Sequence, residues 1–195
     1  MKVDPDTYML MDNYLRYLAE YYKPTQHAYI GRVFKTEHLA FVTGLSVTLS
    51  RTTAQYLLSN SAIPKRIQKN DDKDHNRYDN NNVPDECTAE QFEGIGAADD
   101  FALSACLSSV GVYPSYTRDG LGRERFLHFD PSYHYLGINE QQAPEWYRRF
   151  SFTPLRPRNM CCSDEACAFH YVYGGRQNDT LVWDTFFGWW HWKQL

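Results

Sequence analysis

Two aspartates separated by a single residue stand close to the start of the chain. Asp4 and Asp6 flank Pro5, and they follow a short segment that predicts half of a strand. Carboxylate oxygens are the ligands that Mg²⁺ and Mn²⁺ prefer, and such sites leave positions open for substrate phosphates. The pair therefore predicts a divalent-metal site at a strand end, whereas Asp72-Lys73-Asp74 lies in a polar segment and is expected by chance.

A second pair of carboxylates begins a helix predicted over 97–110. Asp99 and Asp100 lie in its first turn, where the helix dipole stabilises negative charge. One interpretation is a general base that takes the proton of an acceptor hydroxyl. The other is plain N-terminal capping, which the spacing alone favours because such caps are common.

Three further residues, one histidine and two arginines, each have a functional and a structural interpretation. His170 lies in a strand predicted over 167–173, between two aromatic residues. Such a histidine is usually a packed structural residue, but neutral imidazole also binds Mn²⁺, and spacing does not decide. Arg118 and Arg123 lie in a glycine-containing loop, where they either face a phosphate or form part of a solvated turn.

The other segments alternate helices with strands, which predicts an α/β chain. Helices are expected over 7–22 and 52–58, the latter capped by Ser50, and strands over 28–34 and 41–49. Residues 64–86 are polar and low in complexity, which predicts a disordered surface insertion.

Size and composition restrict the classes of protein. With 195 residues, 43% of them hydrophobic, the chain is long enough for one domain with a core. The net charge of -4 gives no support for binding to nucleic acid or to an anionic membrane. No apolar run reaches about 18 residues, and no signal peptide or anchor is recognised. Five cysteines and a sequon at Asn178 nevertheless suit a lumenal protein, so an incomplete N-terminus is expected.

Taken in order, these segments resemble the inverting β-1,3-glycosyltransferases of glycosyltransferase family 31, over the C-terminal half of those enzymes. The most specific motifs are Cys161-Cys162-Ser163-Asp164 and Phe169-His170-Tyr171-Val172, which are typical of the core 1 branch of the family. The resemblance also covers residues 1–8, 30–35, 99–106 and 117–124.

The resemblance implies the C-terminal part of a GT-A (Rossmann-like) fold. It also implies a type II membrane protein of the Golgi or endoplasmic reticulum. The expected reaction transfers galactose from UDP-galactose to the 3-hydroxyl of GalNAc on Ser or Thr of a glycoprotein, with Mn²⁺. By position, Asp4 and Asp6 flank the metal, His170 is its distal ligand and Asp100 is the candidate base. Trp146 matches an aromatic residue near the acceptor.

The sequence departs from the family pattern at several points. Pro5 stands between the two metal carboxylates, where the family has a third acid. Asp99 stands where the family has Glu. The glycine-rich loop of the family is reduced to Thr43-Gly44-Leu45-Ser46, so Gly44 is the expected contact to donor or acceptor. The half that carries the membrane anchor and the uridine-binding strands is expected to be missing, which leaves the activity of this chain open.

By the same resemblance, Cys87, Cys106, Cys161 and Cys162 form the paired set, which allows three connectivities. Cys167 is expected to be a buried free thiol. Whether the chain forms a homodimer stays open. Two alternatives also remain: a non-catalytic lumenal chaperone or binding paralogue on the same fold, and a β-1,3-glycosyltransferase that uses another donor.

Overall fold

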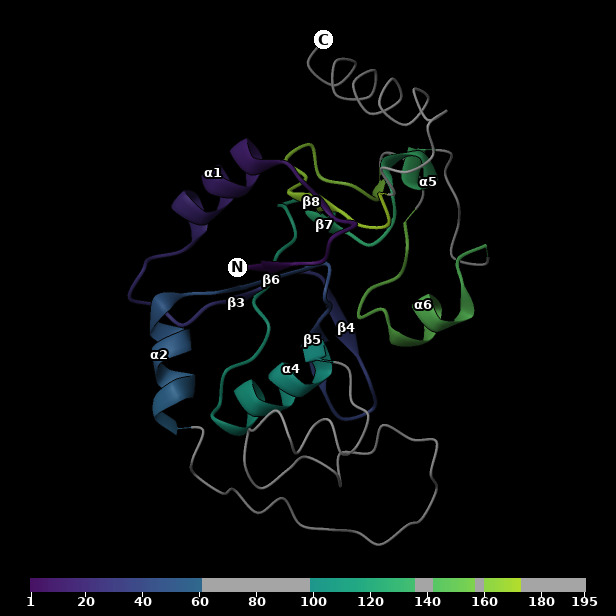
Figure 1. The fold of residues 1–195 in the computed structure, drawn as a ribbon. Helices are drawn as coiled ribbons and strands as arrows, with labels where there is room; N and C mark the ends of the chain where they lie inside the picture. The colour runs from purple at the N-terminus through teal and green to yellow at the C-terminus, as the bar shows by residue number, and fades with distance from the viewer. Residues whose placement is uncertain (61–98, 136–141, 157–159, 173–195) are drawn as a thin grey trace, which may run out of the picture.

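The computed structural model describes residues 1–60, 99–135, 142–156 and 160–172 (Figure 1). The predicted insertion over 64–86, Cys87 and the sequon at Asn178 lie outside these residues. Helices and strands are mixed along the chain, which agrees with the α/β class. The helices are α1 (Met11–Tyr21), α2 (Arg51–Asn60), α4 (Asp99–Ser109), α5 (Pro131–Tyr135) and α6 (Glu145–Phe150).

The strands are short and form small sheets. They are β1 (Lys2–Val3), β2 (Tyr8–Met9), β3 (Tyr29–Ile30), β4 (Val33–Lys35), β5 (Ala40–Val42), β6 (Ser46–Leu49), β7 (Phe126–Leu127) and β8 (Ala168–Phe169). Two sheets have three strands, in the orders β1-β6-β3 and β2-β8-β7, and β4 pairs with β5. Among the described strands, β7 and β8 are parallel and every other pair is antiparallel.

The central strands β3 and β6 are covered on both faces. Because side chains alternate along a strand, Ile30 packs with Tyr14 of α1 on one side, and Tyr29 packs with Leu107 of α4 on the other. Figure 1 shows α1 and the β7–β8 pair on one side of these strands and α2 and α4 on the other. The hydrophobic core is therefore divided into layers by the sheet that carries the N-terminal aspartates.

Two predicted strands are interrupted in the structure. The strand predicted over 28–34 breaks at Gly31, where a Cβ atom would lie only 2.1 Å from the carbonyl oxygen of Ser46. The strand predicted over 41–49 breaks at 43–45, where the chain turns between β5 and β6. The prediction of two continuous strands was wrong because β-propensity carries no information about such close approaches.

Other boundaries also differ from the predictions. The helix predicted over 7–22 begins only at Met11, because Tyr8 and Met9 pair with β8 instead. The strand predicted over 167–173 shrinks to Ala168–Phe169, and Tyr171 adopts a positive φ of 55°. The predicted cap of α2 is confirmed, since the hydroxyl of Ser50 accepts a hydrogen bond of 3.1 Å from the backbone amide of Thr53. None of the helices described here is long and apolar enough to cross a membrane.

A buried ion pair joins distant parts of the fold. Arg32, in the break between β3 and β4, is 2% exposed and forms a salt bridge with Glu124. Glu124 also accepts hydrogen bonds from Arg118 Nε (2.9 Å) and from the hydroxyl of Thr153 (2.6 Å). Burial by itself would raise the pKa of Glu124, but Arg32 and Thr153 outweigh it and hold the pKa below its ordinary value. This carboxylate is therefore ionised in the folded protein.

Replacing Glu124 with Gln should lower the free energy of unfolding by about 3 kcal/mol, because Arg32 would remain buried without its full counter-charge. Urea denaturation measures the change. The matched control is Glu20→Gln, on an exposed position of α1, which should stay within about 0.5 kcal/mol of the unmodified chain. Equal stability of the two variants would contradict the role given to Glu124.

The lowered pKa of Glu124 also predicts a pH dependence. Because the pKa is lower in the folded than in the unfolded chain, this stabilisation is fully present above the ordinary value of 4.5 and is lost as the pH falls through the folded value. The free energy of unfolding of the unmodified chain should therefore fall more steeply than that of Glu124→Gln between about pH 5 and pH 3. Parallel pH profiles would argue against a lowered pKa.

Candidate metal and acid–base site

Strand pairing brings His170 to the two N-terminal aspartates. Asp4 and Asp6 lie in the turn between β1 and β2, which is closed by a hydrogen bond of 3.1 Å from the amide of Thr7 to the carbonyl oxygen of Asp4. Tyr8 pairs with Phe169 in the antiparallel β2–β8 ladder, so the next residue, His170, lies opposite the turn. The amide of Val172 then donates to the carbonyl oxygen of Asp6 at 2.9 Å, which fixes the two segments together.

The three side chains converge on one point. His170 Nε2 lies 3.0 Å from Asp6 Oδ1 and 3.7 Å from Asp4 Oδ2. One ligand atom from each residue lies within 4.8 Å of the others. The imidazole is buried and the two carboxylates are partly exposed, so an ion could be reached from solvent. Two carboxylate oxygens and one imidazole nitrogen suit a borderline-hard divalent cation such as Mn²⁺.

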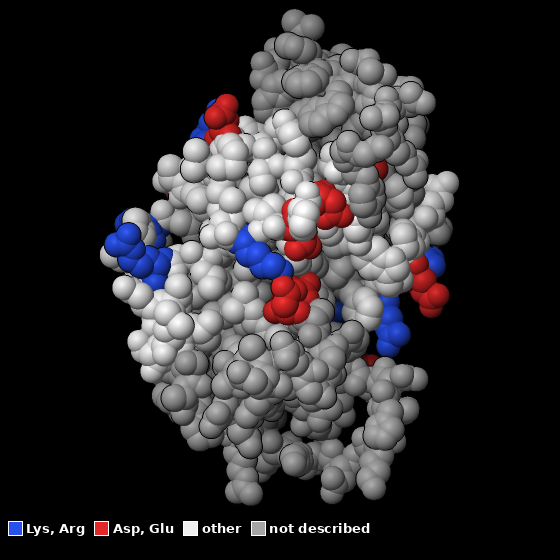
Figure 2. Space-filling view, viewed as in Figure 1, with Lys and Arg blue, Asp and Glu red and all other residues white. Residues whose placement is uncertain are grey.

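A basic side chain lies beside the carboxylates. Lys2 forms ion pairs with Asp99 and, at 3.7 Å, with Asp4. Figure 2 shows acidic side chains on both sides of a basic one near the middle of this face. An exposed pair of this kind is worth about 0–1 kcal/mol, so Lys2 moderates the negative charge without closing the site. Sequence reasoning did not single out this lysine, because its partner Asp99 lies 97 residues away.

Gly44 joins the metal carboxylates to Asp100. Its backbone amide donates a hydrogen bond of 3.0 Å to Asp100 Oδ2, while a Cβ atom on it would lie 2.6 Å from Asp4 Oδ2. No side chain could fill this position unless Asp4 moved. Gly44 therefore lies between the two acidic groups, and a donor or acceptor contact by Gly44 stays a prediction.

Asp100 has the environment of a usable base. Its Oδ1 accepts a hydrogen bond of 2.8 Å from the amide of Phe101, so each carboxylate oxygen holds one backbone donor. Burial raises the pKa of Asp100 above its ordinary value, against the lowering effect of these two donors. A raised pKa makes the carboxylate a stronger base. Capping and base chemistry are therefore compatible at this residue.

Trp146 connects to the metal residues through a histidine that the sequence analysis did not single out. Trp146 lies 38% exposed on α6, with its ring 5.3 Å from that of His128. The His128 ring in turn lies 5.0 Å from the ring of His170. In the parallel β7–β8 pair Leu127 is opposite Phe169, so the two histidines follow at the same level. In the sequence, each histidine directly follows a hydrophobic residue, Leu127 or Phe169. This repeated pattern was the signal that could have pointed to His128.

His128 and His170 both have a buried Nδ1 without a hydrogen-bond partner among the described residues, and His170 also faces two carboxylates through Nε2. Burial, together with the charge that His170 would carry, lowers the pKa of His128 well below its ordinary value, so its imidazole is neutral near pH 7. His170 Nδ1 is buried and finds no hydrogen-bond partner in the described part of the chain. Instead the His170 ring stacks on Tyr171 at 4.2 Å. Tyr171, with its positive φ, follows the end of β8, and its ring lies against His170, the candidate metal ligand.

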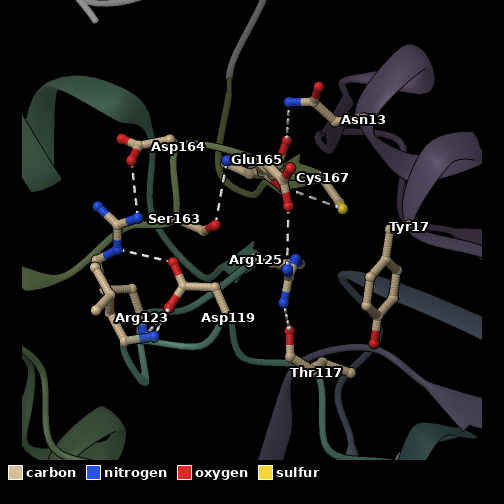
Figure 3. A network of polar contacts seen from close by, with 12 residues as sticks. Asn13, Tyr17, Thr117, Asp119, Arg123, Arg125, Ser163, Asp164, Glu165 and Cys167 are labelled. Atoms are coloured by element: carbon tan, nitrogen blue, oxygen red, sulfur yellow. Dashed lines mark hydrogen bonds and ion pairs between the residues drawn. The ribbon is translucent and has the colours of Figure 1, made fainter. Parts of the chain in front are cut away.

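The two predicted phosphate-facing arginines serve other contacts. Figure 3 shows Arg123 between two carboxylates: its Nε donates to Asp119 and its Nη2 to Asp164, each at 2.8 Å. Arg118 donates through Nε to Glu124 at 2.9 Å. The structure therefore does not bring either guanidinium group into contact with the Asp4, Asp6 and His170 side chains. A donor-binding role for these arginines stays a prediction.

The described cysteines are either in disulfides or free. Cys161 and Cys162 are joined to each other, and Cys106 is also in a disulfide. Cys167 is a buried free thiol, as expected, and burial raises its pKa to about 12. Since a thiol with this pKa is protonated at neutral pH, Cys167 acts as a small apolar core residue.

Comparison with known proteins bears on the resemblance seen in the sequence motifs. A scan against models of protein families finds none that matches the chain. The chain is similar to glycoprotein-N-acetylgalactosamine 3-beta-galactosyltransferase 1 of Xenopus laevis, with 28% identity over 172 residues, which cover 88% of this chain. The chain spans only 41% of the length of that relative. The resemblance predicted from the sequence motifs is thus confirmed: nearly all of this chain is similar to part of a galactosyltransferase of the core 1 type.

Proposed function

We propose that this chain is the metal-binding and base-carrying part of an inverting β-1,3-galactosyltransferase with a GT-A fold. The observation that carries the proposal is the convergence of Asp4, Asp6 and His170 on one point, with Asp100 linked to it through Gly44. The similarity to a galactosyltransferase supports the type of reaction. The donor is UDP-galactose, the acceptor is a GalNAc-bearing glycoprotein, and the protein resides in the Golgi.

Each residue of the candidate site has a separate role in the proposed reaction. Asp4, Asp6 and His170 hold Mn²⁺, which when bound supplies positive charge for the donor pyrophosphate. Asp100 accepts the proton of the acceptor hydroxyl, since its two backbone donors orient the carboxylate and burial strengthens it as a base. Trp146 presents a partly exposed ring to the apolar face of the acceptor sugar. Gly44 keeps side-chain atoms out of the space between the acids.

Titration of UDP into the purified chain, with and without Mn²⁺, tests the proposal directly. Binding that requires Mn²⁺ would support a working donor site within these 195 residues. Binding of Mn²⁺ without binding of UDP would mean that the uridine-binding part lies elsewhere. If neither binds, the same fold would better suit the non-catalytic chaperone or binding paralogue.

Removing a ligand of the candidate metal should weaken Mn²⁺ binding. Loss of a residue that only supports a metal ligand costs about 10–100-fold in affinity, so Asp6→Asn and His170→Ala should each cost at least about tenfold. Calorimetry or the water relaxation rate measures the affinity. Asp12→Asn, an exposed acid of α1, is the matched control and should bind Mn²⁺ unchanged. Equal affinities of all variants would show that the metal does not bind here.

The base assignment predicts a different pattern. In a galactose-transfer assay, Asp100→Asn should reduce the rate of transfer by about 10²–10⁴-fold, because general base catalysis is worth that much. Mn²⁺ affinity should remain unchanged, since Asp100 is not among the metal ligands. Asp99→Asn, its exposed neighbour, should retain most of the transfer rate. A rate for Asp100→Asn within threefold of the unmodified enzyme would exclude Asp100 as the base.

A further inference from the structure

A second cavity lies away from the carboxylates of the candidate metal site. Its volume is about 280 Å³, and it is bounded by the β4–β5 hairpin, the segment 113–118 and residues 152–153, with Arg32 and Glu124 among its lining. Typical small-molecule sites range from about 300 to 1,000 Å³, so this cavity suits a ligand of about one ring. None of the metal residues, Asp100 or Trp146 lines it.

The charges in this cavity do not cancel. Its lining contains two arginines, Arg32 and Arg118, and one carboxylate, Glu124, which is ionised. Both arginines already share Glu124, so the group carries one surplus positive charge. Arg32 uses its two Nη groups on Glu124, Tyr147 and Ser151. Arg118 contacts Glu124 through Nε, and its two Nη groups have no protein partner among the described residues.

The walls of the cavity are aromatic and open to solvent. Tyr113, Tyr116 and Phe152 line it, and they are 66%, 72% and 52% exposed. Flat rings with polar tips cover the apolar faces of sugars and leave their hydroxyls hydrated. Lys35 is a third cation next to the cavity, since its Nζ lies 5.7 Å from the centre of the Phe152 ring. A low-dielectric wall around an uncompensated cation strengthens its attraction for an anion.

We propose that this cavity binds a sugar acid: one pyranose ring that carries a carboxylate. The carboxylate lies on the two Nη groups of Arg118, which present parallel donors in the geometry that a carboxylate accepts. The ring packs against Tyr113, Tyr116 and Phe152. This site is independent of the proposed metal site, because the two share no lining residue.

An NMR titration of the purified chain with glucuronate tests the proposal. Glucose is the neutral probe with the same ring, and benzoate is an aromatic carboxylate without hydroxyls. Glucuronate should bind at least about tenfold more tightly than glucose, since an ionised partner strengthens the hydrogen bonds. Equal binding of the two sugars, tighter binding of benzoate, or no binding of glucuronate would each overturn the proposal.

Two variants locate the binding. Arg118→Gln should reduce glucuronate affinity about tenfold and leave glucose affinity unchanged, while Arg16→Gln, on an exposed position of α1, should change neither. Arg118 also contacts Glu124, so Arg118→Gln could lose affinity through a folding defect. Tyr116→Ala is therefore a second test of the site, because it leaves the ion pairs intact. Tyr116→Ala should weaken both sugars. Asp4→Asn should not affect them, and unchanged glucuronate affinity in Tyr116→Ala would contradict the assigned site.

Discussion

The structure depends on one buried carboxylate. Glu124 binds Arg32 from the β3–β4 break, Arg118 from its own loop and Thr153 beyond α6, while its backbone pairs with the segment that holds the joined cysteines. The strands of these segments are only two to four residues long, so few ladder hydrogen bonds hold each of them. A buried charge is stable only when its partners are held in place, so this group fixes the segments relative to one another.

The candidate site depends on a different constraint, which is the absence of a side chain. The turn at Gly44 approaches Asp4 on one side and receives Asp100 on the other. The pairing of β1 with β6 holds the N-terminal turn next to Gly44, and the amide of Gly44 joins it to the start of α4. Geometry imposed by backbone atoms is more rigid than geometry imposed by long side chains, which is what positioned acids require.

The two sites use charge in opposite ways. At the Asp4, Asp6 and His170 side chains negative charge accumulates, with only Lys2 to offset it, and a cation is therefore favoured. Around Arg118 one positive charge remains after Glu124 is satisfied, and an anion is favoured. Arg32 and Glu124 separate the second site from the aromatic group around Tyr147, to which Arg32 also donates. A protein that handles glycans would have use for both.

The sequence by itself determined most helix positions and the cap of α2, and it singled out Asp4 and Asp6 as a pair. The Asp4–Asp6 spacing and the hydroxyl of Ser50 are local signals, which can be read from neighbouring residues. Only the tertiary structure decided how His170 meets the aspartates, why one predicted strand breaks at Gly31, and what Arg118 contacts. These features arise from strand register and close packing between segments far apart in the chain, and residue types along a single sequence do not encode such distances.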